Sequence, residues 1–242
     1  MRASAKISRP VSVITALLPR MRGHAVEGRI ADLRRDLSTG LRMTAVAVVP
    51  AAIALIVLAQ PIADVVFRHH NIRPADARYI AWVMVAFAAG LVPFCVFQLL
   101  LRAFYSLRDT RTPALINVVA TAVNIAADLI LYAVLPVGDR AFGLALGFSA
   151  SYWLAAAITA RAVSHRLHGL DGRRVVRTYV RLGVASVIAG AIALALARAC
   201  TAVLGSGFAG AVVALVAGGG IGGALLLMLV TRMHIGETTG LL

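Results

Sequence analysis

Apolar runs long enough to cross a bilayer recur six times along this chain. They cover residues 43–67, 79–102, 113–136, 141–164, 179–201 and 208–232. A helix rises about 1.5 Å per residue, so about 20 residues cross a hydrocarbon core of about 30 Å. Lipid cannot pair with an open backbone, so continuous runs of this kind are most economically helical. The sequence therefore predicts an all-α polytopic membrane protein with six transmembrane helices.

Basic residues gather on alternate connections between these runs. Of the 24 Lys and Arg residues, 19 lie before residue 43, in 102–112, in 161–181 and in the C-terminal tail. The other three connections hold the remaining five. Because positively charged loops stay in the cytoplasm, both termini are expected there. The net charge of +14 then reflects topology, and no nucleic-acid-binding motif accompanies it.

Residues 24–41 form an amphipathic stretch before the first run. Its apolar positions recur at spacings of four, three, four and four: Val26, Ile30, Leu33, Leu37 and Leu41. The pattern fits a helix on the cytoplasmic membrane surface, or a connector packed on its own protein. The expected organisation is a helix stub and surface helix over 1–42, four transmembrane helices over 43–164, and a basic loop with two further helices over 165–242.

A polar stripe runs along the third apolar run. Asn117, Thr121, Asn124 and Asp128 follow one another at spacings of four, three and four, which places them on one helix face. Tyr132 extends the stripe. A charged carboxylate near the bilayer centre costs about 2.5–3.5 kcal/mol, so we expect this face to line a bundle interior or a watery cavity.

Three roles for Asp128 remain open on these residues. It could make a structural hydrogen bond as a neutral acid, because burial disfavours its charged form. It could share a hard cation such as Na⁺ with Asn124, since both side chains offer oxygen ligands. It could also carry a proton during transport. No enzyme signature or other metal site accompanies the stripe, and both cysteines lie in apolar runs.

The connection "RAFYSLRDTRTP", residues 102–113, is dense in polar side chains. Thr112 is the predicted N-cap of the next helix, with Pro113 at its first position. Asp109 is expected to cap that helix or to pair with Arg108 or Arg111. The fourth run has Gly143, Gly147 and Ser151 at intervals of four, a spacing typical of close helix packing.

Several stretches together resemble a known family, the MurJ/MviN lipid II flippases of the MATE-like superfamily. They are "ALLPRMRG" (16–23), "GLRMTAVAVVPAAIALIVLAQPIADVVF" (40–67), "LLRAFYSLRDTRTPALINVVATAVNIAADLIL" (99–131) and "AFGLALGFSASYW" (141–153). The most specific part is the loop containing Arg102, Tyr105, Asp109, Arg111, Thr112 and Pro113. The resemblance covers most of the chain up to about residue 166.

The resemblance implies a fold of fourteen helices, of which this chain holds the ninth to the fourteenth. Residues 10–18 are then the end of the eighth helix. The first four runs complete the second lobe, and the last two are an additional C-terminal pair. In this family Asn124 and Asp128 match positions of a sodium site on the eleventh helix, and Ser149 is a candidate ligand on the twelfth. No other cofactor is implied.

The function implied is that of the C-terminal portion of a lipid II flippase in the bacterial cytoplasmic membrane, working by alternating access in peptidoglycan synthesis. Expected partners are membrane lipids, lipid II and a separately encoded N-terminal half, without nucleic acid. Alternatives are a related polysaccharide-lipid flippase, a cation-coupled drug exporter, or a truncated membrane scaffold without transport.

Overall fold

The computed structural model describes residues 29–67 and 73–204, and further on residues 210, 212–213, 215–220, 223–224 and 228. These residues contain helices and no strand: α2 (Ile30–Val57), α3 (Ala59–Phe67), α4 (Pro74–Ser106), α5 (Arg111–Val134), the 3-10 turn η2 (Val137–Asp139), α6 (Arg140–Arg166) and α7 (Gly172–Leu204). Five of the helices are long and apolar enough to span a membrane. The all-α multi-spanning prediction is confirmed, whereas the predicted stub at 10–18 and most of the sixth run lie outside the described residues.

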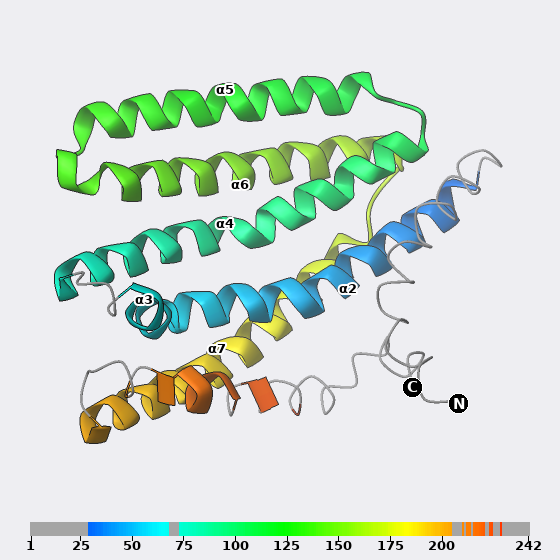
Figure 1. Ribbon diagram of the computed structural model, residues 1–242. Coiled ribbons are helices and arrows are strands. Elements are labelled where there is room, and N and C mark those ends of the chain that lie inside the picture. The colour runs from blue at the N-terminus through cyan, green and yellow to red at the C-terminus, as the bar shows by residue number, and fades with distance from the viewer. Residues whose placement is uncertain are drawn as a thin grey trace, which may run out of the picture.

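The long helices lie side by side in the order α5, α6, α4, α2, α7, which is not their order in the chain (Figure 1). α6 contacts both α5 and α4, and α2 contacts both α4 and α7. At one edge, α5 has a single extensive neighbour among the described residues, which is α6. Only Pro113 and Ile116 of α5 are buried. The stripe-bearing helix therefore lies at one edge of the described bundle.

Of the two predictions for residues 24–41, the structure favours a connector packed on its own protein over a helix on the membrane surface; residues 24–28 lie outside the described residues. α2 begins at Ile30 and continues without a break to Val57. Leu33, Leu37 and Leu41 are buried in a cluster with apolar side chains of α4. The apolar face of this stretch is thus covered by its own protein. A periodicity of 3.6 residues indicates a buried face and does not say what buries it.

The first predicted span, 43–67, is two helices. α2 ends at Val57 and the chain turns sharply at Leu58, so that Figure 1 shows α3 end-on while α2 lies across the view. Pro61 has no amide hydrogen and cannot donate to the Val57 carbonyl, which ends the regular ladder there. Ala59 and Ala63 of α3 then pack against Ala81 of α4.

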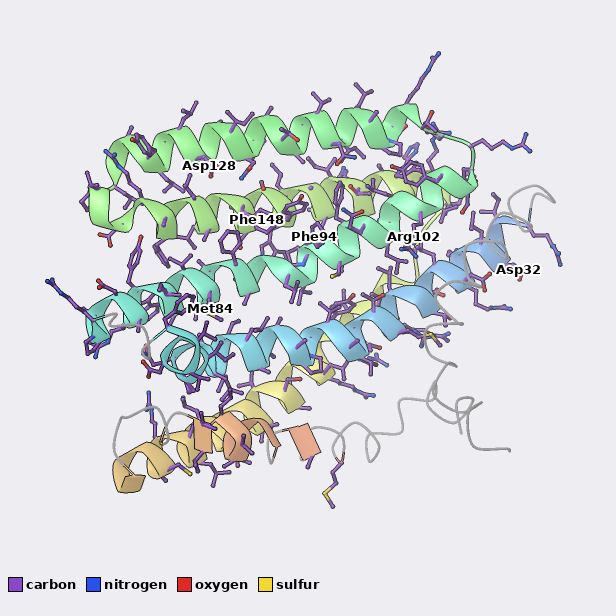
Figure 2. All side chains as sticks on the ribbon, viewed as in Figure 1. Asp32, Met84, Phe94, Arg102, Asp128 and Phe148 are labelled. Atoms are coloured by element: carbon purple, nitrogen blue, oxygen red, sulfur yellow. The ribbon has the colours of Figure 1, made fainter. Side chains whose placement is uncertain are left out.

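α4 and α6 make the most extensive contact in the bundle, through small residues and aromatic rings. At Gly90 an added Cβ would lie 2.9 Å from the Cα of Ser149, so glycine permits the close approach of the two backbones. Phe94 of α4 packs against Tyr152 of α6, and Phe148 of α6 packs against Phe87 of α4, with ring centroids 4.9 Å and 5.2 Å apart. Figure 2 shows Phe94 and Phe148 between the two helices. These contacts fix the register of α6 along α4.

Both helices with an internal proline continue through it. Pro93 of α4 lacks an amide hydrogen, so the carbonyl of Ala89, four residues earlier, loses its regular helical donor. The indole of Trp153 on α6 donates to this carbonyl at 3.2 Å. The neighbouring Ser149 hydroxyl donates to the carbonyl of Ala86. Two side-chain bonds from α6 therefore hold the turn of α4 that leads into the close approach at Gly90.

α7 packs on α2, where Leu182 is buried with Ala45 and Val49, and Gly190 meets the side chains of Ile53 and Val57. Ala185, Ala189, Ala193 and Ala197 are all buried and recur every four residues along one face. Tyr179 adds a polar anchor, because its hydroxyl donates to the Leu41 carbonyl at 3.1 Å. The division of the chain into units at residues 42 and 164 remains a prediction.

Candidate functional site

The connection between α4 and α5 is a tightly determined turn. Arg108 has φ of +58°, in the left-handed region. Its amide donates to the Tyr105 carbonyl, and the amide of Asp109 donates to the Phe104 carbonyl, at 3.2 Å and 3.0 Å. These two bonds form the Schellman motif that ends many helices, in which glycine usually takes the left-handed position. An arginine takes that position here.

Asp109 caps α5. Its Oδ1 accepts the Thr112 amide at 3.0 Å, and its Oδ2 accepts the Thr112 hydroxyl at 2.7 Å. The prediction of Thr112 as the N-cap is wrong, because α5 already begins at Arg111 and Thr112 is the donor. An aspartate that accepts the amide three residues ahead has the geometry of an N-cap. Four residues thus end one helix and start the next.

Asp109 pairs with an arginine far away in the sequence. The Nη2 of Arg166, at the end of α6, lies 3.2 Å from its Oδ2. The prediction named Arg108 or Arg111 as the partner, whereas the ion pair is made with Arg166. Hydrogen bonds from the amide and hydroxyl of Thr112 lower the pKa of the Asp109 carboxyl, and the charge of Arg166 lowers it further. The turn is therefore fastened to the end of α6 by an ionised carboxylate.

The other residues of this loop have modest contacts. The Arg102 carbonyl accepts the Ser106 hydroxyl at 2.9 Å, and the Arg102 side chain is half-buried. Tyr105 and Arg111 are exposed, whereas Pro113 is buried in the first turn of α5. The loop therefore connects the end of α4, the start of α5 and, through Asp109, the end of α6.

The structure divides the polar stripe of α5. Asn124 and Asp128 are half-buried, and Figure 2 shows Asp128 on the side of α5 that faces α6. Asn117, Thr121 and Tyr132 are exposed, because α5 is the edge helix and α6 covers only part of its face. The Asn117 amide donates to the Pro113 carbonyl of its own helix at 3.1 Å. Within the described part of the chain, the predicted inward orientation therefore holds for Asn124 and Asp128.

Glycines of α6 face α5, as the small-residue spacing predicts. At Gly143 an added Cβ would lie 3.3 Å from the Cβ of Leu131. At Gly147 it would overlap the Oδ1 of Asp128 and lie 3.6 Å from the Cβ of Ala127. Any larger residue at 147 would occupy the space that the carboxylate uses.

Two polar atoms in this contact have no hydrogen-bond partner among the described residues. They are the Nδ2 of Asn124 and the Oδ1 of Asp128, and both are inaccessible to solvent. A buried polar atom without a partner costs about 1–3 kcal/mol. The assignment of an amide's O and N rests on its partners, so Asn124 can equally turn its oxygen to this side. A carboxylate and an amide oxygen one helical turn apart suit a hard cation or a shared proton.

The described residues contain no cluster of three His, Cys, Asp or Glu side chains. Ser149 does not complete the site, because its hydroxyl points away from α5 and donates to the Ala86 carbonyl of α4. Tyr132 lies one helical turn beyond Asp128. The guanidinium of Arg140 is 3.9 Å from the centre of its ring, a cation–π contact. Sequence reasoning missed Arg166 and the placement of Gly147 against Asp128, since both depend on how helices pair.

Comparison with known proteins decides the family. The family model described as "Lipid II flippase MurJ" matches residues 10–214. The chain belongs to this family. A MurJ relative from Haemophilus influenzae is 33% identical over 126 residues, which is 50% of this chain and 25% of the relative. One from Rhizobium tropici is 26% identical over 197 residues, 81% of this chain and 36% of the relative.

The fold is that of MurJ as well. A solved structure titled "Lipid II flippase MurJ, inward closed conformation" superposes with a TM-score of 0.67 at 16% identity. The match covers 93% of this chain and 43% of the solved MurJ chain. The chain therefore spans well under two thirds of the MurJ proteins that it matches. Its membrane helices and its family confirm a multi-pass membrane protein.

Proposed function

We propose that this chain is the C-terminal portion of a flippase that moves lipid II across the bacterial cytoplasmic membrane by alternating access. The observation that carries the proposal is the family match over residues 10–214. A two-lobed transporter exposes its cavity to each side in turn when the lobes rock against each other. This chain would supply α2 to α6 as part of one lobe, and α7 with the following segment as an addition to it. The first lobe of the transporter would supply the rest.

The proposed orientation places both termini in the cytoplasm. The supporting observation is the 19-to-5 split of Lys and Arg between the two sides. The α4–α5 turn and the end of α6, joined by Asp109 and Arg166, then lie on the cytoplasmic side. Arg140 and Tyr132 lie on the other side, because α5 and α6 each cross the membrane once.

Asn124 and Asp128 are the proposed coupling pair. The unpartnered Oδ1 of Asp128, in a contact from which solvent is excluded, supports the fit of a sodium ion. When bound, the ion supplies a positive charge that keeps the carboxylate ionised between two helices. Asp128 would provide the charged oxygen and Asn124 the amide oxygen, while Gly147 leaves them room. Occupation of the pair would then favour one arrangement of α5 on α6, which biases the equilibrium between lobe orientations.

Complementation tests the proposed function. Cells depleted of their own lipid II flippase receive this chain alone, the first lobe of a relative alone, or both together. Growth is expected to return only with both, provided that membrane fractions contain both polypeptides. Rescue by this chain alone would overturn its assignment as a portion of the transporter. Absence of rescue by both, with both present in the membrane, would argue against lipid II flipping.

A further inference from the structure

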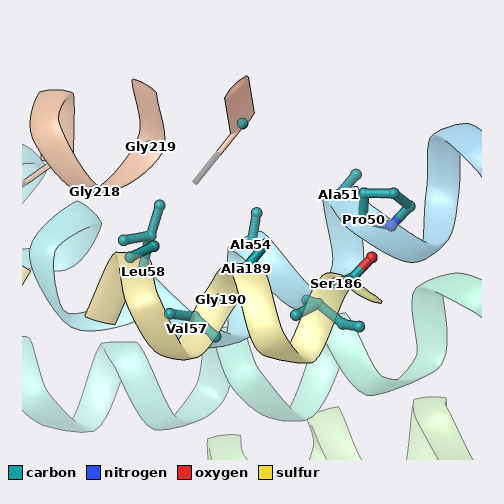
Figure 3. Close-up of a pocket in the computed structure, with 13 residues that line it drawn as sticks. Pro50, Ala51, Ala54, Val57, Leu58, Ser186, Ala189, Gly190, Gly218 and Gly219 are labelled. Atoms are coloured by element: carbon teal, nitrogen blue, oxygen red, sulfur yellow. The ribbon is translucent and has the colours of Figure 1, made fainter. Parts of the chain in front are cut away.

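A cavity of about 210 Å³ lies between α2, α7 and the described glycines of the following segment (Figure 3). Its wall on α2 runs from Pro50 to Leu58, and its wall on α7 runs from Ser186 to Ala193. Gly218, Gly219 and Gly223 close one side. The described lining contains no charged side chain, so the cavity excludes an ionised ligand.

Ser186 is the polar exception in this lining. The residue is 2% exposed, and its hydroxyl has no hydrogen-bond partner among the described residues. Figure 3 shows its oxygen on the side of Pro50. Helical hydroxyls usually donate to a carbonyl three or four residues earlier, as Ser151 and Thr159 do in α6. Ser186 thus holds a buried donor and acceptor that a ligand could satisfy.

Pro50 borders the same cavity and leaves one backbone carbonyl of α2 without its regular donor. It has no amide hydrogen, so the Val46 carbonyl loses its regular helical donor. The equivalent carbonyl in α4, that of Ala89, is paired with Trp153. In α2 the proline borders the cavity instead. One end of the cavity is therefore bordered by Pro50 and the unpaired hydroxyl of Ser186, and the rest of the described lining is hydrocarbon.

Size and polarity together define the ligand. An apolar cavity of about 150 Å³ in a soluble protein holds benzene, whereas pockets for drug-sized ligands begin at about 300 Å³. The geometry points to a binding site for a small uncharged amphiphile, a medium-chain alcohol or a phenol. Its hydroxyl pairs with Ser186, and its hydrocarbon part lies between α2 and α7. The bound molecule would bridge these helices and stabilise their contact.

Photolabelling of the full chain in phosphatidylethanolamine/phosphatidylglycerol nanodiscs tests this site. The probes are octanol with a diazirine in its chain and the matching diazirine octane without the hydroxyl. The alcohol is expected to label peptides 50–58 and 186–193 about fivefold more strongly than the hydrocarbon, which corresponds to about 1 kcal/mol for the added hydrogen bond. Unlabelled octanol should compete.

Three variants complete the test. Ser186→Ala should abolish the preference for the alcohol, and Ala54→Phe should fill the cavity and abolish labelling by both probes. Ser151→Ala, which removes a hydroxyl outside the cavity, should change neither. Equal labelling of the wild type by both probes would show mere space for a bilayer lipid chain and would overturn the proposal. The Ser186→Ala result decides the question even where Ala54→Phe fails to fold.

Discussion

The indole of Trp153 donates to the carbonyl of Ala89, which Pro93 leaves without its regular helical donor. The proline and the tryptophan lie on different helices, α4 and α6, and their effects on the backbone of α4 offset each other. Interhelical hydrogen bonds in membranes contribute about 0.6 kcal/mol on average and at most about 1.7 kcal/mol. The contact therefore lends itself to a double-mutant cycle.

Trp153→Phe should lower the free energy of unfolding by about 0.6–1.7 kcal/mol in a Pro93 background. In a Pro93→Ala background the restored amide of residue 93 pairs with Ala89, so the same change should cost less. Thermal or denaturant unfolding in detergent measures all four proteins. Trp82→Phe, at an exposed tryptophan on α4, controls for loss of an indole. An equal cost in both backgrounds would contradict the coupling.

Asp109→Asn should make stability less dependent on pH. The pKa of Asp109 is lowered in the folded state, so its charge contributes stability that is fully present above the unfolded value of about 3.9. That contribution is lost as the pH falls through the lowered folded pKa. At pH 7 we expect a cost of about 0.3–1 kcal/mol, typical of a carboxylate at a helix N-terminus. Unfolding between pH 3 and pH 7 measures it.

The matched control for this change is Asp139→Asn, since Asp139 precedes α6 without capping it by a side-chain hydrogen bond. It should alter the pH dependence less than Asp109→Asn does. A difference between wild type and Asp109→Asn that grows as the pH falls toward 3 would contradict the assigned direction.

Asp128→Asn should abolish stabilisation by sodium. In wild type, replacing choline chloride by sodium chloride should raise the unfolding midpoint, and a ligand at 100 times its Kd contributes about 2.7 kcal/mol. Thr121→Val, on the same face but exposed, should keep the response. Equal sodium responses in wild type and Asp128→Asn would remove Asp128 from an ion site. A wild type that responds to pH and not to sodium would indicate a proton carrier.

Gly147→Ala should destabilise the α5–α6 contact by about 1–3 kcal/mol, because its methyl group overlaps the Asp128 carboxylate. The sodium response should weaken in the same variant. Gly183→Ala is the control, since no atom lies within 4 Å of its new methyl group. That change should be neutral or stabilise α7 by up to about 1 kcal/mol. Unfolding midpoints with and without sodium separate the two effects.

Leu37→Ala should cost about 2–5 kcal/mol, because Leu37 is 0% exposed in the cluster between α2 and α4. A helix that merely rested on the membrane surface would lose vesicle affinity and keep the stability of the bundle. Arg35→Ala, on the exposed face of the same turn, should change stability little. Unfolding in detergent distinguishes the two arrangements of residues 30–41.

The sequence predicted the membrane helices because their length and polarity are local properties. It also placed Asn124 and Asp128 on one face, since helical spacing alone determines that. It could not predict which face of α5 would be covered, because this depends on α5 lying at the edge of the described bundle. Similarly, the amphipathic pattern of 30–41 is compatible with lipid headgroups or with α4, and only tertiary packing distinguishes them.

Partners distant in sequence account for the other differences. The sequence predicts that Asp109 caps α5 or pairs with a cation of its own loop. Asp109 does cap α5, but its ion-pair partner is Arg166, at the end of α6. The donor to Ala89 comes from α6, across the contact with α4. Each contact depends on the register between two helices, which composition and spacing along one helix do not specify. Register also determines that the Ser149 hydroxyl lies toward α4, where it donates to Ala86, and away from Asp128.

Gly147 ties two properties that most proteins can adjust separately. The side chain of residue 147 determines how near α6 can come to α5, and the same position determines whether Asp128 has space to sit between them. Selection for a tighter or looser helix pair at this position therefore also alters the environment of the carboxylate. A descendant of this chain that replaced the glycine would need a compensating change on α5 at the same time. Among related sequences, substitutions at residues 128 and 147 should accordingly occur together.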